Sequence, residues 1–325
     1  MKTKTNLYCY GCIHLNQDKM WYTRDVMKEV NFMKMKKMLF ALLTLAMVMP
    51  VTNVKADSEA YLVLGKDLNA NEKATVLKLL GVENENDYNV SYVTHDEEKK
   101  YLSSYISASQ IGSRALSSVL LEQMDTNAGI TVETKNITYV TEKMYQNALI
   151  TAGVKDVKLT VAGPFKISGT AALVAATKSY EIMTGKTLNN NAVDTANNEL
   201  SVTSDVAKET GSKDDAADLV AALKQNVASM GDDYTREKGK EALKEIENKQ
   251  NIQLNEDTEN KILDLMDKIK GINLDEDALK TQAKNIYESI KGYADIINKN
   301  KGILTTIASK VKEFLSTIIN FFTGK

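Results

Sequence analysis

From residue 57 onward the sequence contains no cysteine and no tryptophan, one histidine (His95) and one proline (Pro164). Without cysteine this part forms no disulfide, so its stability must come from a hydrophobic core, which 269 residues are enough to build. Any histidine- or cysteine-based catalytic arrangement would have to use His95. The HExxH, GxSxG, Walker and GxGxxG motifs are also missing. We therefore predict no metal and no cofactor, and the sequence favours no enzyme class.

The chain also lacks an excess of positive charge. Of its 41 basic and 43 acidic residues, 32 and 40 lie after residue 56, which gives that part a formal net charge of −8. Nucleic-acid binding depends on neutralising phosphates with basic side chains, so we exclude nucleic acid as a general partner. The apolar run Met38–Met49 has twelve residues, fewer than the ~20 that a membrane-spanning helix needs.

Met33–Ala56 has the pattern of a secretory signal peptide. Lysines at positions 34, 36 and 37 precede the apolar run, Pro50 follows it, and Val54-Lys-Ala56 fits the residues expected at a cleavage site. The sequence therefore predicts cleavage after Ala56 and a protein that works outside the cytoplasm, secreted or associated with the cell envelope.

Residues 1–32 precede this predicted signal peptide. Cys9 and Cys12 have the CxxC spacing of zinc and redox sites, but no second pair follows and no strand–helix context surrounds them. Lys28-Glu-Val30 can be encoded by a bacterial ribosome-binding sequence just before the Met33 codon. Our interpretation is that residues 1–32 are translated upstream DNA and that Met33 is the true start.

Residues 57–188 alternate strand-like and helix-like segments and predict an α/β domain. Asn69 with Glu72, and Thr94 with Glu97, have the spacing of capping boxes that begin two of its helices. The order β-α-β-α-β-β-α-β-α predicts a mixed sheet with packed helices. The expected strands are Tyr61–Leu64, Val90–Val93, Leu116–Leu121, Ile130–Ile137 and Val157–Val161.

Residues 189–292 have helical periodicity almost throughout and predict an all-α domain. Residues 293–325 then predict an amphipathic C-terminal helix with six apolar residues three or four positions apart and a local excess of lysine. This helix either docks on the bundle or contacts a membrane surface or an envelope protein. The six residues are Leu304, Ile307, Val311, Leu315, Ile318 and Phe322.

The sequence offers one loop as a candidate binding site, Gly163–Thr170. It follows a strand and opens a helix, where backbone N–H groups can hold a small anion with help from Lys166, Ser168, Gly169 and Thr170. The ordinary interpretation, which we favour, is that Ser168 or Thr170 caps the helix. By the same reasoning we expect His95, directly after a cap, to be an exposed first-turn residue.

The segments 136–153 and 162–173, which read NITYVTEKMYQNALITAG and AGPFKISGTAAL, resemble the YpuA-like family of secreted Gram-positive proteins. That family is catalogued as a domain of unknown function. The similarity extends over about residues 64–293 and implies export and the two-part layout, but it brings no assigned activity and no catalytic residue.

These observations favour a non-enzymatic binding or scaffolding protein of the Gram-positive cell envelope. The alternative is a cofactor-free hydrolase that cleaves cell-wall polymer with carboxylates, whose pairing the sequence does not reveal. Neither interpretation fixes the oligomeric state.

Overall fold

The computed structural model describes residues 60–250, 252–272, 274 and 279. These residues belong to one compact unit. The predicted signal peptide, the N-terminal extension and the apolar residues of the predicted C-terminal helix lie outside the described residues.

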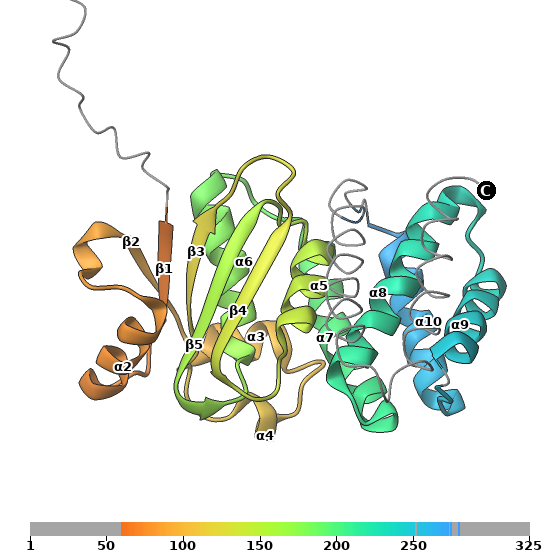
Figure 1. Cartoon of the computed structure of the whole chain (residues 1–325), viewed down its shortest axis with the longest axis horizontal. Helices are drawn as coiled ribbons and strands as arrows, with labels where there is room; N and C mark the ends of the chain where they lie inside the picture. The colour runs from red at the N-terminus through yellow and green to blue at the C-terminus, as the bar shows by residue number, and fades with distance from the viewer. Residues whose placement is uncertain (1–59, 251, 273, 275–278, 280–325) are drawn as a thin grey trace, which may run out of the picture. The chain divides into compact units, whose positions relative to one another are not determined.

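The first part of the described chain is a five-stranded mixed sheet with packed helices, as the sequence predicts (Figure 1). The strand order is β2-β1-β3-β5-β4, in which β3 runs antiparallel to both of its neighbours and the other four strands are parallel to one another. The strands are β1 (Ala60–Gly65), β2 (Asn89–Val93), β3 (Ser118–Gln123), β4 (Ile130–Ile137) and β5 (Val157–Ile167).

Helices cover both faces of this sheet. One face packs against α2, through a small cluster that includes Leu62 of the sheet and Val76 of the helix. The other face forms the main core with α5 and α6, in which Val63 and Leu159 are buried. The helices of this part are α2 (Ala70–Leu80), α3 (His95–Leu102), α4 (Ala108–Ile111), α5 (Glu142–Ala152) and α6 (Thr170–Thr184), with a short 3-10 turn, η1 (Glu85–Asp87).

Local capping fixes where several helices begin, and the predicted capping boxes are confirmed. The side chain of Asn69 accepts a hydrogen bond from the Glu72 N–H while the Glu72 carboxylate accepts from the Asn69 N–H. Thr94 and Glu97 do the same at the start of α3. Both boxes satisfy N–H groups that the first helical turn leaves without partners.

The second part is helical, as predicted, and it packs directly on the first. Ala196 and Leu200 belong to the main core together with residues of the sheet, because α7 lies against α5. The predicted boundary at residue 188 stays a prediction, since the described residues on its two sides share a core. The elements are α7 (Asn190–Thr210), α8 (Lys213–Met230), η2 (Gly231–Asp233), α9 (Arg236–Gln250) and α10 (Glu256–Lys270).

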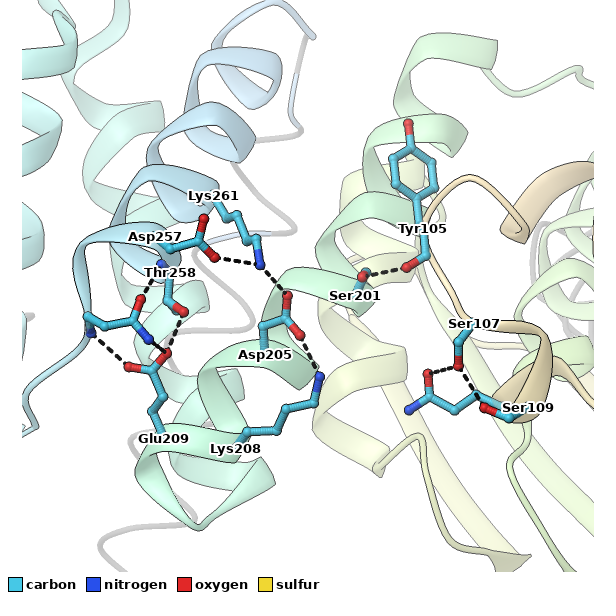
Figure 2. Close-up of polar contacts among 12 residues, drawn as sticks. Tyr105, Ser107, Ser109, Ser201, Asp205, Lys208, Glu209, Asp257, Thr258 and Lys261 are labelled. Atoms are coloured by element: carbon cyan, nitrogen blue, oxygen red, sulfur yellow. Dashed lines mark hydrogen bonds and ion pairs between the residues drawn. The ribbon is translucent and has the colours of Figure 1, made fainter.

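Carboxylates near the end of α7 hold α10 in place, as Figure 2 shows. Glu209 accepts hydrogen bonds from the backbone N–H of Asn255 at 2.8 Å and from the Thr258 hydroxyl. Lys261 forms ion pairs with Asp205 of α7 at 3.1 Å and with Asp257 at 2.8 Å. Within the described residues, no helix is long and apolar enough to cross a membrane.

Candidate functional site

The sheet brings the ends of several distant segments to one edge. Because β1, β2, β4 and β5 are parallel, their carboxyl ends meet there. Asp67 follows β1, His95 follows β2, and Ser168 with Thr170 follows β5. In open α/β sheets this edge is where ligands bind. We call these residues, with Glu98 of α3, the carboxyl-edge site.

The centre of the site is a pair of titratable side chains, His95 and Glu98. They lie three positions apart on α3, so both project from one face of the helix. The distance from His95 Nδ1 to Glu98 Oε2 is 3.6 Å. Glu98 is 1% exposed, whereas the His95 side chain retains 21% exposure. His95 is the first residue of α3 after the Thr94 cap, as expected, but its ring is half-buried beside a buried carboxylate and not exposed.

Thr170 connects this pair to the loop that the sequence singles out. Its hydroxyl donates to Glu98 Oε1 at 2.6 Å, and Ser168 Oγ lies 3.2 Å from Thr170 Oγ1. A second contact fixes α3 against α6, since Lys178 donates to Glu97 at 2.7 Å. Of the four residues predicted to bind a ligand, Ser168, Gly169 and Thr170 therefore lie together beside α3.

The prediction that Ser168 or Thr170 caps α6 is wrong. The N-cap is Gly169, which has φ 93° and gives the helix no side-chain cap. A Cβ at Gly169 would lie 2.5 Å from both Ile137 Cγ2 and the Tyr145 hydroxyl, so space as well as backbone conformation requires glycine. The Thr170 hydroxyl is directed to Glu98 instead of to the backbone of its own helix.

Lys166 lies apart from this group, on an exposed bulge of β5. The pairing with β4 jumps from Lys135–Ala162 to Ile137–Ile167, which leaves residues 163–166 outside the ladder. Asn136, with φ 61°, closes the bulge by donating from Nδ2 to the Gly163 carbonyl at 3.1 Å. Phe165, on the same bulge, is 50% exposed.

The electrostatics of the pair follow from its burial. Burial raises the pKa of Glu98, the Thr170 hydrogen bond and His95 oppose that rise, and the charge of Asp67 adds to it. Burial also raises the pKa of Tyr145, with a further contribution from Glu98, and the Tyr145 hydroxyl donates to the Gly169 carbonyl. A carboxyl group in such surroundings can hold a proton at a pH where an exposed one cannot.

Two polar atoms of the pair have no hydrogen-bond partner. Among the described residues, the buried side-chain atoms in this condition are His95 Nδ1, Glu98 Oε2 and Gln250 Oε1. Buried polar atoms are nearly always hydrogen-bonded, so two exceptions in one pair mark the site. They face each other at 3.6 Å, slightly beyond hydrogen-bonding distance.

A second buried carboxylate, Glu199, has a different environment, which we call the Lys224 network. Lys224 donates to Glu199 at 2.8 Å, to the Thr151 hydroxyl at 3.0 Å and to the Asn147 carbonyl at 2.9 Å. Thr151 in turn donates to Glu199. All three Lys224 donors are used, and both ions are at most 1% exposed, so this network joins α5, α7 and α8 and offers nothing to a ligand.

Sequence reasoning missed both pairings. His95 and Glu98 have the i, i+3 spacing of neighbours on a helix, and the α3 and α6 segments each follow a predicted strand, which was the available signal. For the Lys224 network the signal was a lysine four residues after Val220, in the apolar stripe of α8. Over the described part of the chain, no cluster of three or more His, Cys, Asp or Glu side chains is placed to hold a metal ion.

The fold and the site thus define a mixed α/β protein with a helical C-terminal region and a histidine–glutamate pair at the carboxyl edge of its sheet. Residues 64–286 match the family described as "Protein of unknown function (DUF1002)", and the chain belongs to that family. It is 34% identical over 286 residues to a Bacillus subtilis (strain 168) protein named "Uncharacterized protein YpuA", covering 88% of this chain and 93% of the relative. No solved structure matches the chain.

Proposed function

We propose that the chain is an exported binding protein of the cell envelope, and that its ligand docks at the carboxyl-edge site beside His95. The observation that carries this proposal is the pair of buried atoms without hydrogen-bond partners, His95 Nδ1 and Glu98 Oε2. The Lys224 network, which holds helices together, leaves no atom of its ion pair without a hydrogen bond. Export is supported by the signal-peptide pattern of Met33–Ala56.

The arrangement suits binding because a buried carboxylate orients the ring that the ligand meets. Glu98 is fixed by Thr170, and its Oε2 lies 3.6 Å from His95 Nδ1, so the buried carboxylate borders the ring and limits where it can move. Of the residues first suggested for a small anion, Ser168 keeps a partly exposed side chain, whereas Thr170 is buried and its proton is committed to Glu98. We therefore centre the proposal on His95 and not on Lys166.

The test uses the fact that the chain from Asp57 contains one histidine. Its imidazole C–H resonances therefore report on His95 alone. We expect soluble fragments of digested Gram-positive cell wall to shift these resonances in a saturable way, and Glu98→Gln to change the affinity. If the fragments bind while the His95 resonances stay in place, the ligand docks elsewhere and the proposal is wrong.

Hydrolysis of a wall polymer is the second candidate function, and it rests on the same pair. A buried carboxyl with a raised pKa can donate a proton, and a neighbouring imidazole can accept one from water. The experiment above separates the two functions, because fragments recovered with unchanged mass indicate binding. Fragments shortened by wild type and left intact by Glu98→Gln would indicate an enzyme.

The predicted helix over residues 293–325 supplies a separate proposal, contact with a membrane surface or an envelope protein. Comparing the full chain with one that ends at Gly292 tests it. Retention of the full chain in the envelope fraction and release of the shortened chain would support an anchoring role. Equal release of both would contradict it.

A further inference from the structure

The two edge strands of the sheet differ in how they are protected against pairing with another chain. β4 carries Glu133 and Lys135 and is interrupted by a bulge after Lys135, and both features discourage the addition of a strand. β2, at the other end of the sheet (Figure 1), reads NVSYV and has no charge, no proline and no register shift. In the described part of the chain it pairs with β1 alone, so its outer edge is open to a further strand.

The backbone of β2 presents the polar groups of Val90 and Tyr92 to this open edge. The Lys66 N–H donates to the Val93 carbonyl at 2.9 Å, so Val93 directs its N–H and C=O groups toward β1. Because these directions alternate along a strand, Ser91 also faces β1, whereas Val90 and Tyr92 face outward. A strand added at this edge would therefore bond to residues 90 and 92.

The side chains of Val90 and Tyr92 are accessible as well. They are 37% and 39% exposed, and both are in register with Leu62 and Leu64 of β1, so they lie on the same face of the sheet. β-Branched and aromatic side chains on one face of adjacent strands form favourable cross-strand pairs. The open edge therefore offers both backbone hydrogen bonds and an apolar contact.

The charges at the two ends of β2 have opposite sign. Asp87 precedes the strand and is exposed. At the carboxyl end Lys66 is also exposed, with its Nζ 4.5 Å from the centre of the Tyr92 ring. When two copies of one strand pair in antiparallel orientation, the amino end of each lies beside the carboxyl end of the other. The acidic end of β2 then meets the basic end, and the charges attract.

Neighbouring side chains do not oppose this pairing. The acids around β2 are already bound to lysines, in the pairs Glu85–Lys73 at 2.7 Å, Asp96–Lys99 at 3.0 Å and Glu97–Lys178 at 2.7 Å. Lys178 also donates to the Tyr92 carbonyl at 2.8 Å. A carbonyl oxygen has two lone pairs, so Tyr92 can still accept a hydrogen bond from a second chain.

We propose that two copies of the chain associate through β2, antiparallel about a two-fold axis at Ser91, so that their sheets become continuous. The Val90 N–H then donates to the carbonyl of the partner's Tyr92, and the Tyr92 N–H donates to the carbonyl of the partner's Val90. The Val90 side chain lies opposite the ring of the partner's Tyr92. This pairing is reciprocal, as a two-fold contact requires, which favours a second copy over an unrelated strand. It does not depend on the carboxyl-edge site.

Two lysine variants test the interface in the chain from Asp57. We expect sedimentation velocity to show a concentration-dependent monomer–dimer equilibrium for wild type. Val90→Lys should raise the dissociation constant at least about tenfold, because lysine on an edge strand disfavours pairing. Phe165→Lys is the matched control, since it adds the same charge at a residue that is 50% exposed on the bulge of β5 and should dimerise as wild type does. Circular dichroism verifies that both variants are folded.

Single cysteines test the register, because the chain from Asp57 contains no cysteine of its own. In the proposed dimer Ser91 faces its own copy in a pair without hydrogen bonds, with Cα atoms about 4.5 Å apart, which suits a disulfide. We expect mild oxidation to convert Ser91→Cys to a covalent dimer. Asn89→Cys, on the same face of β2, is the control, since the two copies of residue 89 would be about 13 Å apart along the strands.

Three results would overturn the proposal. The first is a wild-type chain that stays monomeric at the highest concentration measured. The second is a dimer that persists in Val90→Lys, which would place the interface elsewhere. The third is a disulfide that forms as readily in Asn89→Cys as in Ser91→Cys, which would contradict the antiparallel register.

Discussion

Glu199 and Glu98 are both buried carboxylates that join helices, yet their surroundings differ in one respect. In the Lys224 network every donor and acceptor of the ion pair has a partner. In the carboxyl-edge site Thr170 satisfies one oxygen of Glu98, and the other oxygen faces a half-buried imidazole at 3.6 Å. A fully satisfied buried pair fixes packing, whereas the carboxyl-edge pair leaves two buried polar atoms without a hydrogen bond, and this difference is the basis of the binding proposal.

The largest effect is expected from breaking the satisfied network. Lys224→Met leaves Glu199 buried without its counter-ion and should lower the free energy of unfolding by about 3–5 kcal/mol. Chemical denaturation of both proteins measures this. The double variant Lys224→Met/Glu199→Gln removes the stranded charge and should regain part of the loss. A single variant as stable as wild type would show that the network is not structural.

A matched pair of threonine variants compares the two sites directly. Thr151→Val removes hydrogen bonds to both Glu199 and Lys224 and should cost about 2–3 kcal/mol. Thr170→Val removes one bond to Glu98 and should cost about 1 kcal/mol, because Glu98 can then bind a proton. Thermal unfolding of both variants measures the difference in stability lost. If Thr151→Val and Thr170→Val lose the same stability, Glu199 and Glu98 do not differ in how strongly they depend on their threonine partners.

The smallest effect, and the most specific, concerns pH. Burial raises the pKa of Glu98 above its ordinary value of 4.5, so the folded protein holds the proton more tightly than the unfolded chain does. The stability that this group contributes is complete below pH 4.5 and is lost as the pH rises through the folded pKa. Glu98→Gln resembles the protonated carboxyl and keeps an acceptor for Thr170.

We therefore expect the melting temperature of Glu98→Gln to increase relative to that of wild type as the pH rises above 4.5. Glu85→Gln is a control for general charge effects, because Glu85 is on the surface in an ion pair with Lys73. Parallel melting curves for wild type and Glu98→Gln across this range would contradict a raised pKa at Glu98.

Much of the α/β layout could be predicted because its signals are local. The capping boxes at Asn69–Glu72 and Thr94–Glu97 span three residues each, and the start of α6 at Thr170 follows from a glycine before an apolar run. The site could not be predicted in the same way. Thr170 and Glu98 are 72 positions apart, and the interpretation of Thr170 as a cap fails because its hydroxyl has a distant acceptor.

Local patterns and composition are enough to predict the order of the strands, the absence of disulfides after residue 56 and a signal peptide, whereas the short helix α4 (Ala108–Ile111) was not predicted. Which buried carboxylates have all their hydrogen bonds depends on how the helices and strands pack. Lys224 meets Asn147 and Thr151 across more than 70 positions, and Thr170 meets Glu98 across 72 positions because α3 packs on α6. Burial and pairing of charges are properties of packed elements, and no local pattern in the chain specifies them.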